Sequence, residues 1–279
     1  MKIKNRIYDE YTQISDLRHY KVVKSNDLIQ KSRFYLSLQE QKIVLYLISK
    51  IKPEDLELKE QYFEIRNFCK VCGLDNDNGA NYKYIKQTLK GLRDKSIWVT
   101  LENGSETTLG WIDKITINRN SGIIAIKIDA MMKPYLLQLQ KQFTQYELFY
   151  TLAMRSQYSI RLYELLKSYE YKRRVIFDMD ELKHLLFADN YVRFPDFKRK
   201  VLDISMREIN SLSDLSVTYE IIKVGRKYGK IEFSISLKKD YYEHLEVSMR
   251  VEGVINAVKT KTLRKKPTKV KLGEGDEAQ

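Results

Sequence analysis

Residues 195–212 read PDFKRKVLDISMREINSL, and residues 215–223 that follow them read LSVTYEIIK. Pro195 suits the first turn of a helix, because its missing N–H would be unpaired there in any case. At 100° per residue, the apolar positions gather on one side of this helix. The inner face comprises Phe197, Val201, Leu202, Ser205, Ile209 and Leu212. The outer face comprises Arg199, Lys200, Asp203, Arg207 and Asn210. The sequence therefore predicts a helix whose exposed side is largely basic, leading into a strand.

The residues around this helix predict a helix-turn-helix with a β-hairpin behind it. Strands are expected at 215–223 and 230–237, joined by the basic, glycine-bounded turn VGRKYG at 224–229. Upstream, the pattern predicts a helix with the capping sequence TQYE at 144–147, a long helix at 156–171, a strand at 174–178 and a short helix at 179–187. A turn at Asp189-Asn190 then precedes the basic helix.

The same order of elements occurs in the first half of the chain. A helix capped by Ser37 and Glu40 and ended by Pro53 precedes a strand at 61–66, a short helix at 67–74, a polar turn at 75–81 and a basic helix at 82–95. Strands at 97–101, 109–117 and 123–128 follow, with a turn at Asn103-Gly104. Leu45-Tyr46 recurs 117 residues later as Leu162-Tyr163, and Val99-Thr100 recurs 118 residues later as Val217-Thr218.

This order predicts an α+β protein with two tandem winged-helix domains, each a helix-turn-helix plus a β-wing, related by a pseudo-twofold internal repeat. The expected divisions are an N-terminal arm (1–24), winged-helix domain 1 (25–138), winged-helix domain 2 (139–242) and a basic C-terminal tail (243–279). The arm is expected to be loosely ordered up to about residue 26. The tail is expected to be a flexible segment that adds non-specific attraction to DNA, binds a partner, or is simply solvated, and the last interpretation is preferred. A single α+β domain without a repeat is the alternative.

The two basic helices differ in chemistry. On the first, Ile85, Leu89 and Leu92 form the inner face. The outer face carries Lys83, Lys86, Gln87, Lys90 and Arg93. Lysines are point charges suited to phosphate, with Gln87 the one base-reading candidate, so this module is expected to position the protein on DNA.

The second helix has the better base-reading residues, because Arg can pair with guanine and Asn with adenine in the major groove. These residues are Arg199, Arg207 and Asn210. Asp203 either accepts a bond from cytosine or orients Arg199 and Arg207, and the orienting role is preferred. Lys198 and Lys200 on the helix, and Arg226 and Lys227 in the wing turn, complete the expected DNA-binding set.

Composition supports a polyanionic partner. The formal net charge is +13, which moderately favours nucleic acid, although an acidic protein or membrane surface would satisfy the same charge. No run approaches the roughly 20 apolar residues of a membrane helix, and the first ten residues lack the apolar core of a signal peptide. We therefore expect a soluble, cytoplasmic protein with no membrane partner.

No catalytic, metal or cofactor site is expected. The chain lacks the G-x-x-x-x-G-K-[ST] sequence that holds nucleotide phosphates, and its three histidines are scattered. Cys69 and Cys72 have the spacing of half a zinc site, but no second pair exists, so two small buried residues are the preferred interpretation. An enzyme is therefore not expected.

Several stretches together resemble the iteron-type plasmid replication initiators, over roughly residues 25–240. They are NDLI at 26–29, Leu38, EQ at 40–41, YSIRLYELLK at 158–167, FKRKVL at 197–202, EIN at 208–210, GRK at 225–227 and IEF at 231–233. The family often has Pro and Ala after the Val-Leu pair, where this chain has Asp203-Ile204-Ser205.

The resemblance implies a bacterial, tandem winged-helix protein that binds directly repeated double-stranded sites, called iterons, in a plasmid origin. It also implies origin opening with a host replication initiator and helicase, and a monomer–homodimer equilibrium in which the dimer represses its own gene. The alternatives are a winged-helix transcriptional repressor and a basic protein-interaction module.

Overall fold

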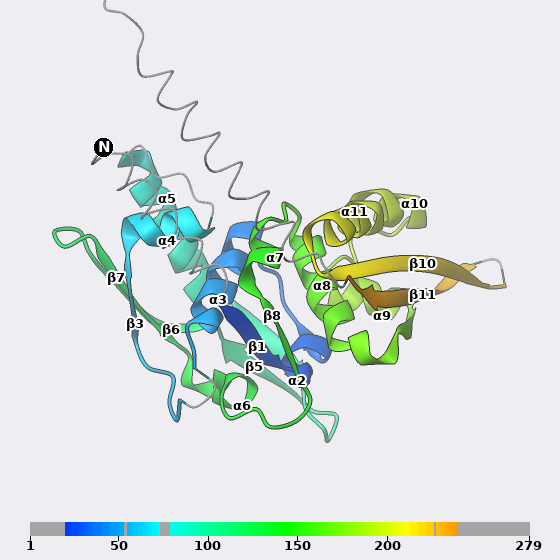
Figure 1. Ribbon diagram of the computed structural model, residues 1–279, viewed down its shortest axis with the longest axis horizontal. Coiled ribbons are helices and arrows are strands. Elements are labelled where there is room, and N and C mark those ends of the chain that lie inside the picture. Colours follow the sequence, from blue (N-terminus) through cyan, green and yellow to red (C-terminus); the bar gives the residue numbers. More distant parts are fainter. Residues whose placement is uncertain (1–19, 53–54, 73–78, 226, 239–279) are drawn as a thin grey trace, which may run out of the picture. The chain divides into compact units, whose positions relative to one another are not determined.

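The computed structural model describes residues 20–52, 55–72, 79–225 and 227–238 (Figure 1). The helices of the first half are α2 (Asn26–Gln30), α3 (Leu38–Ser49), α4 (Ile65–Cys72), α5 (Gly79–Arg93) and α6 (Lys133–Leu136), with a 3₁₀ turn at Ala130–Met132. Its strands are β1 (Lys21–Ser25), β2 (Ser32–Arg33), β3 (Gln61–Glu64), β4 (Ser96–Thr100), β5 (Glu106–Gly110), β6 (Ile112–Asn118) and β7 (Ile123–Ile128).

The second half contains fewer strands and a segmented helix. Its strands are β8 (Phe143–Glu147), β9 (Arg174–Asp178), β10 (Leu215–Val224) and β11 (Lys227–Leu237). Its helices are α7 (Leu148–Leu152), α8 (Gln157–Ser168), α9 (Met179–Leu185), α10 (Phe194–Phe197), a π-helical turn (Lys198–Leu202) and α11 (Asp203–Leu212), with a 3₁₀ turn at Glu170–Lys172.

Helix α3 begins where the sequence predicted. The Ser37 hydroxyl accepts from the Glu40 N–H at 3.4 Å, and the Glu40 carboxylate accepts from the Ser37 N–H at 2.7 Å. Two donors that the helix itself cannot satisfy are thereby paired. The predicted capping box is confirmed, and it fixes the start of a helix buried along most of its length.

Each half contains a three-stranded antiparallel sheet with the same strand order. In the first half the order is β3-β7-β6, and in the second it is β9-β11-β10. In both sheets the strand before the short helix pairs with the last strand of the hairpin that follows the basic helix. Strands β10 and β11 form a long hairpin that projects beyond α9 and α11 (Figure 1). Two winged-helix units in tandem are the result.

The repeat is confirmed in its element order but not in one of its residue pairs. Val99-Thr100 lie in β4, which belongs to a separate sheet with the order β2-β4-β5. The counterpart of β10 by strand order is β6, not β4. The β4–β5 hairpin has the same alternation of buried and exposed residues as a wing strand, so the pattern alone does not separate them.

Three other sequence expectations are wrong in detail. The predicted helix cap at Thr144 to Glu147 lies in strand β8, which pairs with β1 from Lys21 to Ser25, so the last part of the expected loose arm is a strand. The predicted strand at 109–117 is divided at Trp111 between β5 and β6. The wing turn is shorter than six residues, because β10 continues to Val224 and β11 starts at Lys227.

Helix α8 carries a buried charged cluster that bonds it to residues far away in sequence. Lys24 Nζ lies 2.5 Å from a carboxylate oxygen of Glu164, and the Tyr146 hydroxyl donates to the same oxygen. Arg161 donates to the Ser32 carbonyl at 2.7 Å. Burial lowers the pKa of Lys24, an effect that the Glu164 carboxylate opposes, and burial lowers the pKa of Arg161 to about 10. The cluster joins α8 to strands β1, β2 and β8.

Candidate nucleic-acid interface

The second basic helix is one continuous run, Phe194 to Leu212, made of α10, the π-helical turn and α11. Phe197, Val201, Leu202, Ser205 and Ile209 are all fully buried, as the sequence predicted, while Leu212 is only partly buried. The Ser205 and Ser159 hydroxyls lie 3.5 Å apart, where α11 packs on α8. This packing fixes the opposite face of the helix toward the surface.

Three cationic side chains occupy that opposite face. Arg199, Lys200 and Arg207 are all exposed, and the Arg199 side chain is 73% accessible. Arg199 bonds Asp196 one turn earlier at 3.2 Å, and Lys200 lies over the Tyr191 ring at 5.7 Å. The Arg207 guanidinium has no hydrogen-bond or ion-pair partner in the described ranges, although the Arg207 carbonyl accepts from the Ser211 hydroxyl. The face therefore offers guanidinium groups that a polyanion can reach.

The Asp203 carboxylate bonds Lys198 and Tyr219 rather than Arg199 or Arg207, so the expectation that it orients the two arginines by direct contact is wrong. Its two oxygens accept from Lys198 Nζ at 2.7 and 2.9 Å, and one also accepts from the Tyr219 hydroxyl at 3.1 Å. The same contacts raise the pKa of Lys198, chiefly through the hydrogen bond to Asp203. Lys198 is thus paired within the protein, and Asp203 bonds it to strand β10.

Asn210 is bonded to the wing. Its side-chain nitrogen donates to the Val217 carbonyl at 2.8 Å, and its oxygen accepts from the Val217 N–H at 2.7 Å. The nitrogen and the oxygen of this side-chain amide are therefore both bonded to the backbone of Val217, near the start of β10. The sequence could not show this contact, because it depends on where the following strand runs.

A groove of about 870 Å³ lies between the wing and the start of the basic helix. Its cations are Lys183, Arg193, Lys227 and Lys230, and its carboxylates are Asp178 and Asp180. The rings of Phe194 and Tyr228 stack at 4.2 Å with 26° between their planes, so the wing is packed against the first turn of α10. Of the predicted wing residues, Lys227 lines this groove and Arg226 lies outside the described residues.

Sequence reasoning missed Arg193 and Lys230 as members of this surface. Arg193 immediately precedes α10, and Lys230 lies in β11 opposite Asp178 of β9. The available signal was the position of Arg193 at the helix start and of Lys230 beside the wing turn. Arg193 and Lys230 come to line the same groove only when the hairpin packs against the start of the helix.

The first basic helix, α5, presents the expected face. Ile85, Leu89 and Leu92 are buried, whereas Lys83, Lys86, Gln87, Lys90 and Arg93 are exposed. Lys90 pairs with Asp94 at 3.2 Å, and the Arg93 guanidinium donates to the Asp113 carbonyl at 3.3 Å. Lys83, Lys86 and Gln87 have no such partner in the described part of the chain. They remain available to an external ligand.

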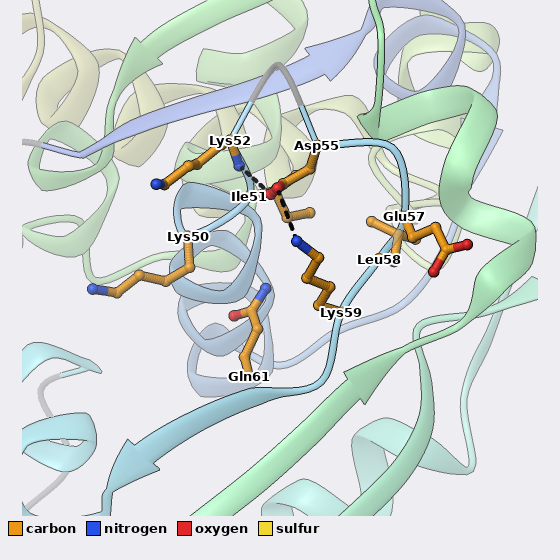
Figure 2. A pocket seen from close by; sticks show the side chains of 8 residues that line it. All are labelled: Lys50, Ile51, Lys52, Asp55, Glu57, Leu58, Lys59 and Gln61. Carbon is orange, nitrogen blue, oxygen red and sulfur yellow. Dashed lines mark hydrogen bonds and ion pairs between the residues drawn. The ribbon is translucent and has the colours of Figure 1, made fainter.

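A smaller hollow of about 260 Å³ lies between the end of α3 and the start of β3 (Figure 2). Lys59 points toward Asp55 at 3.8 Å, and Asp55 also accepts from the Lys52 N–H at 3.1 Å. Burial lowers the pKa of Lys50 to about 8. Its three lysines stand beside two carboxylates, Asp55 and Glu57, so the cationic excess of this hollow is smaller than that of the wing groove, which has four cations and two carboxylates.

The described residues contain neither a cluster of metal ligands nor a membrane-spanning helix. No three His, Cys, Asp or Glu side chains there are grouped closely enough to hold a metal ion. No helix among them combines the length and apolar character needed to cross a bilayer. Cys69 is buried, and burial raises the pKa of its thiol to about 12. The Cys72 side chain lies outside the described residues, so the expected pair stays untested.

Known proteins are similar to this chain in sequence and in fold. The Escherichia coli PI protein is 30% identical over 156 residues, which span 49% of this chain and 51% of that protein. A replication initiation protein of Escherichia coli is 24% identical over 230 residues, 78% of this chain and 70% of that protein. The crystal structure of the Pi initiator protein in complex with iteron DNA superposes with a TM-score of 0.65 at 22% identity, over 80% of this chain and 99% of that one.

Two family models cover most of the winged-helix region. The model described as Initiator Replication protein, WH1, matches residues 21–167, and the one described as Initiator Rep protein, WH2, matches residues 178–235. The first match alone spans more than half of the chain. The chain belongs to the Initiator Replication protein family, whose two winged-helix domains it carries in tandem.

Proposed function

We propose that this protein initiates plasmid replication by binding directly repeated duplex sites, the iterons, at the origin. The observation that carries the proposal is the exposed cationic face of the 194–212 helix beside a cationic groove under its own wing. A helix of this kind fits the major groove, and a basic wing reaches the neighbouring phosphates. Family membership and a structural relative bound to iteron DNA support the same role.

The two winged-helix modules are proposed to have different roles in DNA binding. Helix α5 presents Lys83, Lys86 and Gln87, which have no side-chain partner among the described residues, and lysine ammonium groups suit phosphate. The α10–α11 helix presents Arg199 and Arg207, whose forked donors match guanine. The first module therefore positions the protein, and the second reads bases.

The interface proposed from the structure adds Arg193 and Lys230 to the expected set. It keeps Lys83, Lys86, Gln87, Lys90, Arg93, Arg199, Lys200, Arg207, Arg226 and Lys227. Lys198, Asp203 and Asn210 are assigned to holding the helix and wing together, because each is bonded within the protein.

Three further features belong to the proposal and rest on the family resemblance. They are origin opening with a host initiator and helicase, repression of the gene by a homodimer, and activity in the bacterial cytoplasm without catalysis. The division into a WH1 domain at 25–138 and a WH2 domain at 139–242, flanked by an arm and a tail, is also proposed.

The decisive experiment is a replication assay with the DNA that flanks the gene. We expect direct repeats of about 20 base pairs beside the gene, spaced by whole helical turns. A plasmid with no other origin should be maintained when it carries both gene and repeats. It should be lost when the repeats are deleted or when the gene carries an early stop codon.

The rival functions give different results in the same strains. A repressor would silence a reporter behind the gene's promoter but would not maintain the plasmid. A protein-interaction module would do neither, and either outcome would contradict the proposal.

A further inference from the structure

The helix proposed to read bases has more residues per turn in its middle, at Lys198–Leu202, than an α-helix has. The Asp203 N–H donates to the Lys198 carbonyl, five residues back, where an α-helix would bond four residues back. Fully buried residues recur at every fourth position, Phe197, Val201, Ser205 and Ile209. Strict four-residue spacing over that distance drifts off the buried face of an α-helix, since four residues turn it by about 400°. The π turn corrects this drift.

The extra residue in this turn also changes the angular positions of the exposed residues around the helix axis. In a continuous α-helix, Arg199 and Arg207 would be about 80° apart around the axis, because eight residues turn it by about 800°. A π turn accommodates one extra residue, so the two arginines lie as if seven apart, within about 20° of each other. Both side chains are exposed. The turn therefore brings both guanidinium groups to one face.

An ion pair of the same five-residue spacing spans the π turn. Lys198 Nζ bonds both oxygens of Asp203 at 2.7 and 2.9 Å. Residues five apart in an α-helix are separated by about 140°, so this pair forms only because the backbone is wound as a π turn. The Tyr219 hydroxyl, on strand β10 of the wing, bonds the same Asp203 at 3.1 Å. The turn is thus held from the helix and from the wing.

We propose that Lys198, Asp203 and Tyr219 are positioning residues that hold the π turn, and through it determine which base pairs Arg199 and Arg207 contact together. This inference rests on the proposed function. Without the cluster, the helix can relax toward α-helical winding, which rotates one arginine away from the face that the other shares. Contacts to phosphate do not need that alignment, so non-specific binding should survive.

The test uses the full chain and two 30-base-pair duplexes. One is selected by the wild-type protein from a random pool, and the other is a scrambled duplex of the same composition. The measured quantity is the ratio of the two affinities. Asp203→Asn should lower this ratio by about tenfold, roughly the loss of one good base contact. Tyr219→Phe, which removes only a hydroxyl, should lower it less.

Glu220→Gln is the matched control, because it removes one negative charge from the exposed residue beside Tyr219 on the same strand. It should raise the affinity for both duplexes by the same factor and leave the ratio unchanged. The double variant K198D/D203K restores the ion pair with reversed signs and should recover most of the ratio. Thermal unfolding of each variant identifies any that is not folded.

The outcomes separate this inference from the proposed function. If Asp203→Asn keeps the wild-type ratio, or if the reversed pair fails to restore it in a folded protein, the positioning role is wrong. If the wild-type protein itself selects no sequence from the pool, the proposed function fails first. A loss of affinity shared equally by both duplexes would indicate a purely structural role and would also overturn the inference.

Discussion

At the scale of single residues, the polarity of each side chain predicted its face but not its partner. Arg199, Arg207 and the lysines of α5 are exposed as expected, because charged side chains are costly to bury unless they are paired. The bonds of Asp203 and Asn210 could not be predicted. One depends on a π turn, and the other on the path of β10.

Two basic residues should report the different roles of the two helices. Arg207→Ala should weaken binding to the selected site by about 1–3 kcal/mol and relax one base position. Lys86→Ala should weaken binding to all sequences alike and reduce the salt slope by about one. Fluorescence anisotropy with single-base-substituted duplexes measures both. Altered specificity in Lys86→Ala alone would mean that the module roles are reversed.

Asn210→Ala should destabilise the protein without relaxing base specificity. The substitution removes two hydrogen bonds to Val217 and leaves that residue's backbone groups without their partner, at a cost of about 1–3 kcal/mol. Urea unfolding measures the loss. Ser211→Ala, at the exposed neighbouring position, should change stability less. A base preference lost at one position, with stability unchanged, would show instead that Asn210 reads DNA.

The Cys69 thiol should be unreactive in the folded protein. Reaction with an alkylating agent needs the thiolate, and a pKa raised to about 12 keeps the buried thiol protonated at pH 8. Mass spectrometry of the peptide containing Cys69, after brief alkylation at pH 8, should show modification only when urea is present. Equal modification with and without urea is the result that excludes a buried Cys69.

At the scale of elements, sequence patterns predicted correctly those helices and caps whose contacts lie between residues close in sequence. The Ser37 capping box and the two basic helices depend on residues close in sequence, and all were predicted. Strand β8 was mistaken for a helix cap because its partner β1 lies about 120 residues away. The β4–β5 hairpin was mistaken for a wing because alternation identifies a strand but not its sheet.

The charged cluster that joins α8 to β1 should be sensitive to loss of one partner. Glu164→Leu leaves the ammonium of Lys24 buried and unpaired, and should reduce the free energy of unfolding by about 3–5 kcal/mol. The double variant K24M/E164L should recover only part of that loss, because the Lys24 charge is gone while the buried Arg161 still lacks the Glu164 carboxylate.

An exposed ion pair provides the control for this cluster. Asp94→Asn removes the partner of Lys90 at the end of α5, where both side chains are accessible to solvent. It should cost at most about 1 kcal/mol. Urea unfolding of the wild type and the three variants measures whether the buried cluster stabilises the protein more than the exposed pair does. Equal losses for Glu164→Leu and Asp94→Asn would mean that the buried cluster contributes no more than a surface pair.

At the scale of the whole molecule, the net charge of +13 and the repeated order of elements predicted a tandem DNA-binding protein. The groove under the second wing was not predicted, since its lining joins residues 192–195 at the helix start to residues 224 and 227–230 of the wing, which follow much later in the sequence. Its cations extend the basic face of the helix into the wing. Part of the net positive charge therefore lies in this groove, beside the residues proposed to read bases.

The most direct test of sequence-specific DNA binding is the affinity of the full chain for its selected duplex and for a scrambled duplex between 50 and 200 mM salt. With roughly eight phosphate contacts, log–log plots should fall linearly with a slope of about −7. At physiological salt the selected duplex should bind at least about a thousandfold more tightly. A flat slope, or equal affinity for the two duplexes at every salt concentration, would contradict sequence-specific binding by this protein.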